Sequence, residues 1–333
     1  MSKVNKSFFK NFVPVLSRDR PLPGHTASST EIILVSINVT GTRIVTSRTD
    51  KSMRVWKSTA DRLIDPIVIE DAHSRSVERV SWDPQREFTF ASVGRDENIK
   101  IWKTTGTLER LIKVEKELGQ SDATSLKIIS YSNDGELIAA VDRDSTVLLY
   151  SVEKDYQKVG EIKLNEHVYD LKWFNFAHGY FACALHDGTT PIYKVDDGEM
   201  TLKTTLRGHR SSATTLAIDP RGTYAAIGSN EGVLSIWNTA SMLNTKVITE
   251  IDESIASVDC SRDGTYVAAT YDRGSNIRVF DVESTEQVYE VPNSVSGQLT
   301  FATIAWFPNK TAFAFSSDHG TTLTLMKKPD RIS

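Results

Sequence analysis

The sequence predicts an all-β protein, a β-propeller of seven blades, on three observations. An acidic residue followed six positions later by an aromatic residue closes an alternating strand, as in "DKSMRVW" and "DENIKIW", and this motif recurs along the chain. A strand, a tight turn and a strand precede each copy. The copies lie 43–48 residues apart, the period of a four-stranded blade and longer than most helical repeats. The closing residues are Trp56, Trp102, Tyr150, Tyr193, Trp237, Phe280 (in a looser copy) and, in the weakest copy, about Leu325.

The strand–turn–strand units carry their own turn residues. In "SINVTGTRIVTS" and "IISYSNDGELIAAV" two alternating runs flank Thr40-Gly41 and Asp134-Gly135, and two other units use proline instead. Glycine and proline supply the backbone conformations that tight turns require. Each unit is therefore predicted to form two adjacent strands of one blade.

The ring needs a closing strand. A propeller is sealed when its last blade takes a strand from the other end of the chain. The chain ends soon after "TTLTLMKK", and "NFVPVLS" at 11–17 is predicted to complete the last blade. We expect a basic N-terminal tail over residues 1–10, a single propeller over 11–326 and a C-terminal tail over 327–333.

One segment also fits a helix. In "LERLIKVEKELGQ", residues 108–120, four apolar side chains share one helical face. The repeat register instead places a fourth strand there, followed by a loop. We favour the strand, because tertiary context overrides local propensity.

Histidines precede three of the strand–turn–strand units, as Gly24-His25, Ala72-His73 and Gly208-His209. Histidine, acid and tryptophan in this order are typical of WD40 repeats, here without the final Trp-Asp pair. In such blades the histidine, a hydroxyl residue of the second strand, the acid and the tryptophan form one hydrogen-bonded chain, so these residues are expected to be structural. They are His25, Asp50, Trp56, His73, Ser92, Asp96, Trp102, Asp144, His209 and Trp237.

Composition narrows the function classes. A net charge of −4 argues against a chain that binds nucleic acid with its whole surface. Two cysteines, Cys183 and Cys260, form neither a disulfide framework nor a metal quartet, and suit a reducing compartment. No apolar run predicts a membrane-spanning helix, and the basic N-terminus lacks the apolar segment of a signal peptide.

Catalytic motifs are missing from the sequence. It contains no G-x-x-x-x-G-K-[ST], no G-x-S-x-G, no H-E-x-x-H and no C-x-x-C. We therefore expect no enzymatic activity, no cofactor, no metal, no small-molecule substrate and no membrane partner.

A binding face is the remaining candidate site, because loops on rigid scaffolds carry function. The loops that lead into the acidic turns are expected on one face of the ring, where arginines could grip an acidic segment. The candidate residues are Arg48, Arg95, Arg143, His186, Asn230 and Arg273.

The succession of blades resembles the WD40 subunit of the THO complex over roughly residues 25–325. The likeness lies in the order of "NVTGTRIVTSRTDKSMRVW", "SVERVSWDPQREFTFASVGRDENIKIW", "YSNDGELIAAVDRDSTVLLY", "HVYDLKWFNFAHGYF" and "AIDPRGTYAAIGSNEGVLSIW". The resemblance implies a nuclear, non-enzymatic subunit that docks on the large helical THO subunit. Through the TREX assembly it implies indirect partnership with a DEAD-box RNA helicase, an export adaptor and nascent mRNA, coupling transcription elongation to mRNA export.

Other readings stay open. A substrate receptor of a ubiquitin ligase usually shows W-D-x-R after the third strand, whereas this chain reads "WKST", "WKTT" and "WNTA". A direct RNA-binding propeller would use basic and aromatic residues together, as in "KSFFKNF" at 6–12. Burial of these aromatic residues in the closing blade would explain them equally well.

Overall fold

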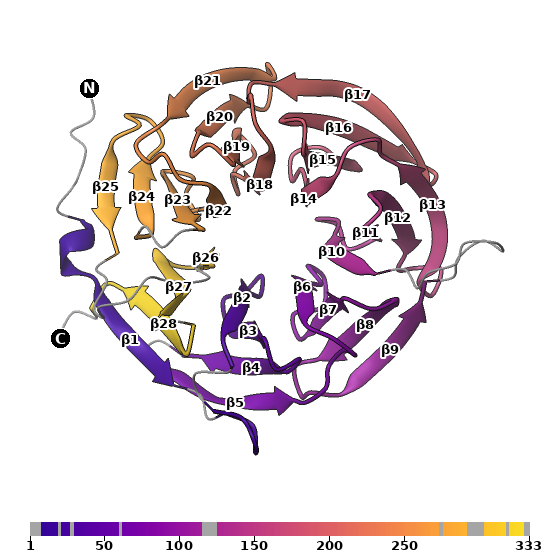
Figure 1. Cartoon of the computed structure of the whole chain (residues 1–333), viewed down its shortest axis with the longest axis vertical. Coiled ribbons are helices and arrows are strands. Elements are labelled where there is room, and N and C mark those ends of the chain that lie inside the picture. The colour runs from indigo at the N-terminus through magenta and orange to yellow at the C-terminus, as the bar shows by residue number, and fades with distance from the viewer. Residues whose placement is uncertain are drawn as a thin grey trace.

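The computed structural model describes residues 8–18, 21–26, 30–59, 62–114, 125–272, 276–291, 303–317 and 320–329. They form seven antiparallel sheets of four strands, arranged as blades around a central axis (Figure 1). The predicted all-β fold with seven blades is thereby confirmed. The described part of the chain holds no helix with the length and apolarity needed to cross a membrane.

Six blades are built from four consecutive strands, and the seventh combines both ends of the chain. The first six are β2 (Ile32–Ile37), β3 (Arg43–Arg48), β4 (Met53–Ser58) and β5 (Leu63–Ile69); β6 (Val77–Trp82), β7 (Thr89–Gly94), β8 (Asn98–Lys103) and β9 (Leu108–Lys113); β10 (Leu126–Tyr131), β11 (Leu137–Asp142), β12 (Thr146–Ser151) and β13 (Gln157–Lys163); β14 (Val168–Trp173), β15 (Tyr180–Leu185), β16 (Thr189–Asp196) and β17 (Glu199–Arg207); β18 (Ala213–Ile218), β19 (Tyr224–Ser229), β20 (Leu234–Asn238) and β21 (Leu243–Ile248); β22 (Ile255–Cys260), β23 (Tyr266–Tyr271), β24 (Arg278–Asp281) and β25 (Gln287–Glu290). The seventh is β26 (Ile304–Trp306), β27 (Ala312–Ser317), β28 (Thr322–Lys327) and β1 (Val13–Arg18), and the 3-10 helix η1 (Phe9–Asn11) precedes β1.

Tight turns join the first and second strands of each blade. In the third blade the N–H of Gly135 donates to the carbonyl of Ser132 at 2.9 Å. Gly135 has a φ of +76°, and a Cβ there would come within 2.9 Å of the Gln85 side chain in the preceding blade. Glycine therefore serves both the turn and the close approach of two blades.

The apolar core lies between neighbouring blades. One cluster joins Val45 and Val55 of the first blade to Val80, Phe90 and Trp102 of the second. The next cluster joins the second and third blades in the same way. Each blade consequently depends on two neighbours for the burial of its two faces.

Strand β1 closes the ring by pairing antiparallel with β28, from Val13 opposite Lys327 to Arg18 opposite Thr322. The predicted closure by an N-terminal strand is confirmed, and the strand spans residues 13–18 rather than 11–17. Lys327 belongs to β28 rather than to the expected C-terminal tail.

The expected boundary of the N-terminal tail at residue 10 is wrong at its last residues. Phe9 is fully buried. Its ring centroid lies 4.9 Å from those of Phe12 and Tyr266 and 5.5 Å from that of Tyr289. The reason is the gain from burying an aromatic ring against the sixth and seventh blades, which draws η1 onto the propeller.

The segment that also fitted a helix is a strand in its first half. Strand β9 pairs with β8, with Arg110 opposite Ile101. Leu108 and Leu111 are 41% and 53% exposed, so the apparent helical face is not a buried stripe. Residues 115–124, which include the rest of that pattern, lie outside the described residues.

We expect Phe9→Ala to destabilise the protein by about 3–5 kcal/mol, because it removes a fully buried ring from the closing cluster. Urea unfolding followed by tryptophan fluorescence measures the change. The matched control is Phe88→Ala, since Phe88 is 47% exposed and should cost less than about 1 kcal/mol. Equal losses in the two variants would contradict a closing role for Phe9.

Candidate interaction site

The second blade contains a complete chain of hydrogen bonds between side chains. His73 is 1% exposed, and its Nδ1 lies 3.0 Å from Asp96 Oδ2. Its Nε2 lies 2.8 Å from Ser92 Oγ, and Trp102 Nε1 donates to the same oxygen at 2.9 Å. A carboxylate only accepts, so Nδ1 carries the proton, and in the neutral ring Nε2 accepts from the Ser92 hydroxyl. The chain joins β7, β8 and the turn between them to the loop that carries His73.

The carboxylate of Asp96 is held in its charged form. Burial opposes ionisation, but the hydrogen bond from His73 and the backbone N–H groups of Ser74 and Asn98, each at 3.0 Å, outweigh it. Together they keep the pKa of Asp96 well below its ordinary value.

The fifth blade keeps the histidine and the tryptophan, moves the hydroxyl, and has no acid bonded to the histidine, since His209 Nδ1 is buried without a hydrogen-bond partner within the residues that the structure describes. His209 Nε2 lies 2.7 Å from Ser235 Oγ, and Trp237 Nε1 donates to Ser235 Oγ at 2.8 Å. Ile227 occupies the second-strand position that Ser92 takes in the second blade, and Ser235 lies opposite it on β20. A search for a hydroxyl on the second strand therefore misses Ser235.

The first blade departs from the expected network at His25, which is exposed. Trp56 Nε1 donates to Thr46 Oγ1 at 3.1 Å, so the tryptophan end is present. Asp50 instead accepts from the N–H of Ser52 at 3.0 Å and lies 3.8 Å from the Arg54 guanidinium. The expectation for His25 is wrong because a buried arginine on the third strand supplies the cation next to Asp50.

Asp144 is likewise not part of a network. It is exposed, whereas Asp142 is buried and accepts from the N–H of Thr146 at 2.8 Å. No histidine precedes the third blade, and the turn is held by the acid two positions earlier.

Four residues of the predicted binding face occupy equivalent positions. The backbone N–H of each donates, at 2.9–3.2 Å, to a carbonyl in the loop that enters the innermost strand of the same blade. They therefore lie on one face of the ring, and all four are exposed: Arg95, Arg143, His186 and Asn230.

Arg48 does not belong to this face. It lies one residue before the equivalent position, which Thr49 occupies, since the N–H of Thr49 donates to the Glu31 carbonyl at 3.0 Å. A shift of one residue in a strand turns the side chain to the other side. Arg48 is 3% exposed and donates to the Thr30 carbonyl at 2.8 Å, so its role is structural. Arg273 lies outside the described residues.

On the same face Arg143 and His186 lie with three residues that the sequence patterns missed, and we call the group the mouth cluster: Lys127, Arg143, His167, Tyr169 and His186. Lys127 Nζ lies 3.1 Å from His167 Nε2. The rings of His167 and Tyr169 meet edge to face with centroids 4.9 Å apart, and the Tyr169 hydroxyl lies 3.1 Å from His186 Nδ1. Aligning the second residues of the innermost strands would have pointed to Lys127 and Tyr169.

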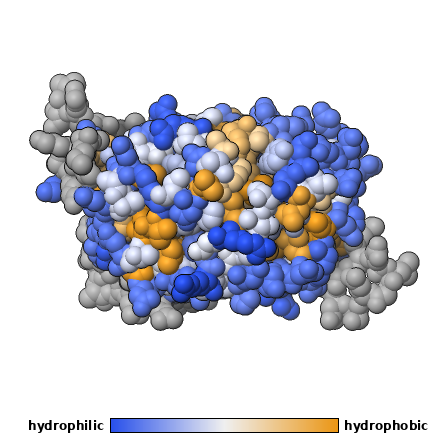
Figure 2. Space-filling model, turned by 90° about the horizontal axis from the view of Figure 1, so that it is seen from above, coloured by the Kyte–Doolittle hydropathy of each residue, from blue (hydrophilic) through white to orange (hydrophobic). Residues whose placement is uncertain are grey.

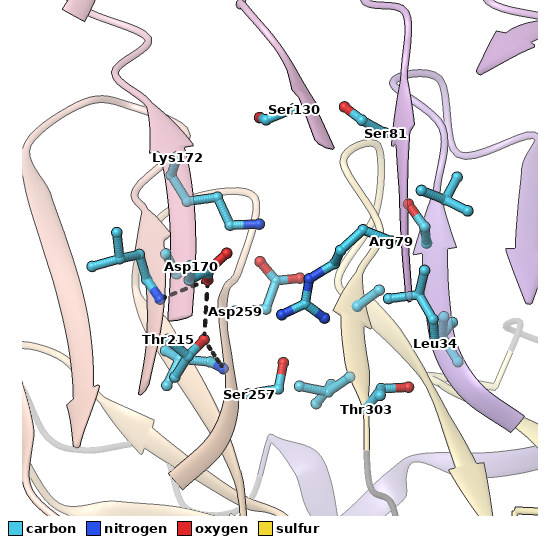
Figure 3. Close-up of a pocket in the computed structure, with 18 of the residues that line it drawn as sticks. Leu34, Arg79, Ser81, Ser130, Asp170, Lys172, Thr215, Ser257, Asp259 and Thr303 are labelled. Carbon is cyan, nitrogen blue, oxygen red and sulfur yellow. Dashed lines mark hydrogen bonds between the residues drawn. The ribbon is translucent and has the colours of Figure 1, made fainter. Parts of the chain in front are cut away.

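A polar channel of about 660 Å³ runs along the axis. Arg79, Asp170, Lys172 and Asp259 line it together with serine and threonine side chains (Figure 3). Among its described lining residues there is no histidine or cysteine that could pair as base and nucleophile.

Of the three channel carboxylates that belong to the described residues, two accept hydrogen bonds from the neighbouring blades. Asp170 accepts from the N–H of Leu216 at 2.9 Å, and Asp259 accepts from the N–H of Trp306 at 2.7 Å. Burial raises the pKa of Asp259 to about 6, against the lowering effect of its backbone donors and of Lys172. These two acids therefore connect innermost strands through hydrogen bonds to the backbone.

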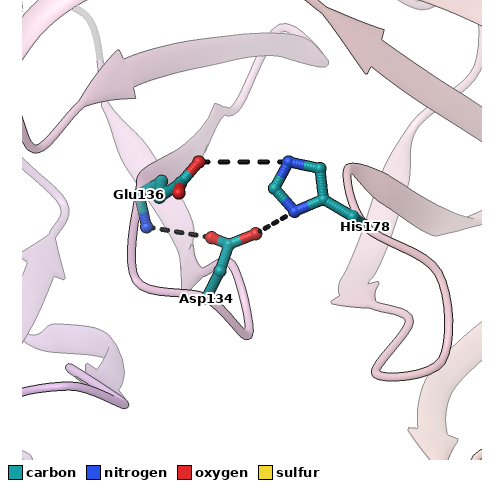
Figure 4. A group of neighbouring side chains, drawn as sticks. All are labelled: Asp134, Glu136 and His178. Atoms are coloured by element: carbon teal, nitrogen blue, oxygen red, sulfur yellow. Dashed lines mark hydrogen bonds and ion pairs between the residues drawn. The ribbon is translucent and has the colours of Figure 1, made fainter.

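An exposed group of Asp134, Glu136 and His178 bridges the third and fourth blades (Figure 4). His178 Nδ1 lies 2.7 Å from Asp134 Oδ2, a hydrogen-bond distance, while Nε2 lies 3.9 Å from Glu136 Oε2. The two ring nitrogens face different acids, one on each side of the ring. We read the group as an ion pair between blades.

Apolar side chains are also exposed on the outer rim. Figure 2 looks onto the side of the ring where β17 and β21 lie and shows hydrophobic groups scattered among polar ones. Leu202, Leu243 and Val247 are 56%, 64% and 51% exposed. Single exposed apolar residues are normal on soluble proteins and do not define a site.

We expect Ser92→Ala to cost about 1–3 kcal/mol for each of the two buried groups that it leaves without a partner, His73 Nε2 and Trp102 Nε1. Ser92→Thr is the matched control, because Thr46 accepts from Trp56 at the equivalent place in the first blade. Urea unfolding should rank the alanine variant well below both wild type and the threonine variant. A threonine variant as unstable as the alanine variant would show that the hydroxyl is not what matters.

The Asp96 network should also make stability depend on pH. A carboxyl whose pKa is lowered by folding contributes stability above its unfolded pKa of about 4, and this contribution is lost as the pH falls below that value. The difference in unfolding free energy between wild type and Asp96→Asn should thus shrink as the pH falls below about 4. A difference that stays unchanged down to pH 3 would refute the assignment.

Two segments of the chain, residues 65–103 and 200–238, match the family model "WD domain, G-beta repeat". THO complex subunit 3 of Arabidopsis thaliana is 22% identical over 286 residues, covering 85% of this chain and 85% of that protein. Protein TEX1 of Saccharomyces cerevisiae is 22% identical over 336 residues, covering 96% and 78%. The WD repeat-containing protein AAC3 of Dictyostelium discoideum is 29% identical over 263 residues, covering 69% and 51%. The chain is thus a seven-bladed β-propeller that contains WD40 repeats.

Proposed function

We propose that this chain is a non-enzymatic scaffold subunit of a THO-type complex in the nucleus. The observation that carries the proposal is the similarity to THO complex subunit 3, which extends over 85% of both chains. AAC3 is more identical, at 29%, but the match spans only about half of that protein. Similarity over most of both chains favours a shared assembly over a shared repeat type.

The architecture supports a scaffold role. The polar groups that the repeats place regularly, such as His73, Asp96 and Asp259, are engaged in hydrogen bonds within or between blades. We assign recognition to the face with Arg95, Arg143 and His186, whose side chains are exposed. Rigid elements that present loops in this way are suited to bind other proteins.

The partners follow from the same proposal. The large helical THO subunit is the direct partner, bound with the other THO subunits. A DEAD-box RNA helicase, an export adaptor and nascent mRNA are reached indirectly, so that the subunit takes part in coupling transcription elongation to nuclear mRNA export.

The test is affinity purification of the tagged chain from nuclear extract at moderate salt with nuclease, read by mass spectrometry. We expect recovery of a large helical THO subunit in about equal amount, together with the DEAD-box helicase, after RNA has been digested. Recovery of a cullin-type ligase instead, or of no protein once RNA is removed, would overturn the proposal. The second outcome would favour direct RNA binding.

A pair of variants tests which face binds. Arg143→Glu reverses a charge on the proposed face, and Lys57→Glu reverses an exposed charge at the end of β4, away from that face. We expect the first variant to recover several-fold less of the helical subunit and the second to recover a wild-type amount. The reverse order would place the docking surface on the other side of the ring.

A further inference from the structure

We propose that the mouth cluster binds carboxylate side chains of an acidic segment in a partner protein. The inference deepens the proposed function, on which the existence of such a partner rests. It names the chemistry of the partner and the five residues that receive it.

Comparing equivalent positions in the second and third blades shows that the charge at the mouth cluster is unusual. In the second blade Glu78, the second residue of the innermost strand, pairs with Arg95 across 2.5 Å between Oε1 and Nε. In the third blade the equivalent residues are Lys127 and Arg143, two cations. The acid that neutralises the arginine in one blade is replaced by a second positive charge in the next.

The cluster keeps N–H donors that its internal hydrogen bonds do not use. Lys127 Nζ carries three protons and has the His167 ring as its hydrogen-bond partner among the described residues. His186 Nδ1 lies 3.1 Å from the Tyr169 hydroxyl and 3.0 Å from Ser212 Oγ. When Nδ1 accepts from a hydroxyl, Nε2 carries the proton and faces another direction. Both residues therefore keep N–H groups for an incoming anion.

Electrostatics favour the same ligand. Burial lowers the pKa of Lys127 to about 8, with Arg143 adding to the effect while Asp142 and Asp144 oppose it. Burial also lowers the pKa of His167, and Lys127, His186 and Arg143 lower it further. A bound carboxylate would offset this repulsion and would favour protonation of both groups.

The acids around the cluster limit what can bind. Asp142 already accepts from the N–H of Thr146, and Asp187 accepts from Thr189. With Asp144 and Glu166 they form a negative margin, because Asp142 and Asp144 flank Arg143, Glu166 precedes His167 and Asp187 follows His186 in the chain. The long phosphate backbone of RNA would meet that margin, whereas one or two carboxylates of a protein segment fit within it. We therefore assign the cluster to an acidic protein segment.

The experiment uses the full chain and hexa-L-glutamate as the probe, with hexa-L-glutamine as the neutral control peptide. Histidine Cε1–H signals are followed by NMR from pH 8 to 5, and His167→Gln identifies the His167 signal. Saturating hexaglutamate should raise the titration midpoint of His167 by about half a pH unit. By reciprocity, this corresponds to about threefold tighter binding of the peptide to the protonated form.

Matched lysine variants separate the site from general charge. Lys127→Gln should weaken hexaglutamate binding at least several-fold, whereas Lys203→Gln, an exposed lysine on β17, should leave it unchanged. Equal weakening in both variants, or an unshifted His167 midpoint, would overturn the inference. Tighter binding of a single-stranded RNA hexamer than of hexaglutamate would also overturn it.

The outcomes remain distinct from those of the proposed function. A chain that binds hexaglutamate through Lys127 but recovers no THO subunit retains the anion site and loses the proposed function. A Lys127→Gln variant that still recovers the THO subunits in full shows that this docking does not use the mouth cluster.

Discussion

Closure of the ring is the constraint on which the rest of the structure depends. The apolar core lies between blades, so an unpaired blade would leave one of its faces in water. The seventh blade is completed by β1, which comes from the other end of the chain. The aromatic ring of Phe9 then packs against Tyr266 and Tyr289 of the sixth blade, so the closing strand is anchored to two blades. Pairing between the two ends of the chain thus supports the packing of the blades against one another.

The innermost strands are joined by a second set of interactions. Ser81 accepts from the N–H of Tyr131 at 2.9 Å, and Asp259 accepts from Trp306 from the equivalent position. Asp170 and Thr215 accept from the next blade two residues earlier in their strands. These four side chains of the channel consequently hold neighbouring innermost strands together.

The fold could be predicted from the sequence because the repeat period, the turn residues and the need for closure all agree. The site could be predicted only in part. The sequence showed which loops share a face, but it placed Arg48 there, one residue out of register with a position that Thr49 occupies. It also located the hydroxyl of each blade by strand, whereas Ser235 reaches the same place from the opposite strand. Errors of one residue or one strand are invisible in a pattern, yet they decide whether a side chain is buried or exposed.

Repeats provide an internal comparison that a single domain lacks. Positions that do the same structural task keep similar chemistry from blade to blade, as the tryptophans at 56, 102 and 237 do in donating to a hydroxyl. Where equivalent backbone positions carry different residue types in different blades, the side chain there is not needed for the shared structural role. The pair of Glu78 and Arg95 shows that the backbone at the mouth accommodates a neutralised pair, and the pair of Lys127 and Arg143 shows that the third blade does not use one. Arg143 and partial burial disfavour the charged form of Lys127 more than Asp142 and Asp144 favour it, so an anion from outside the chain would stabilise this pair of cations.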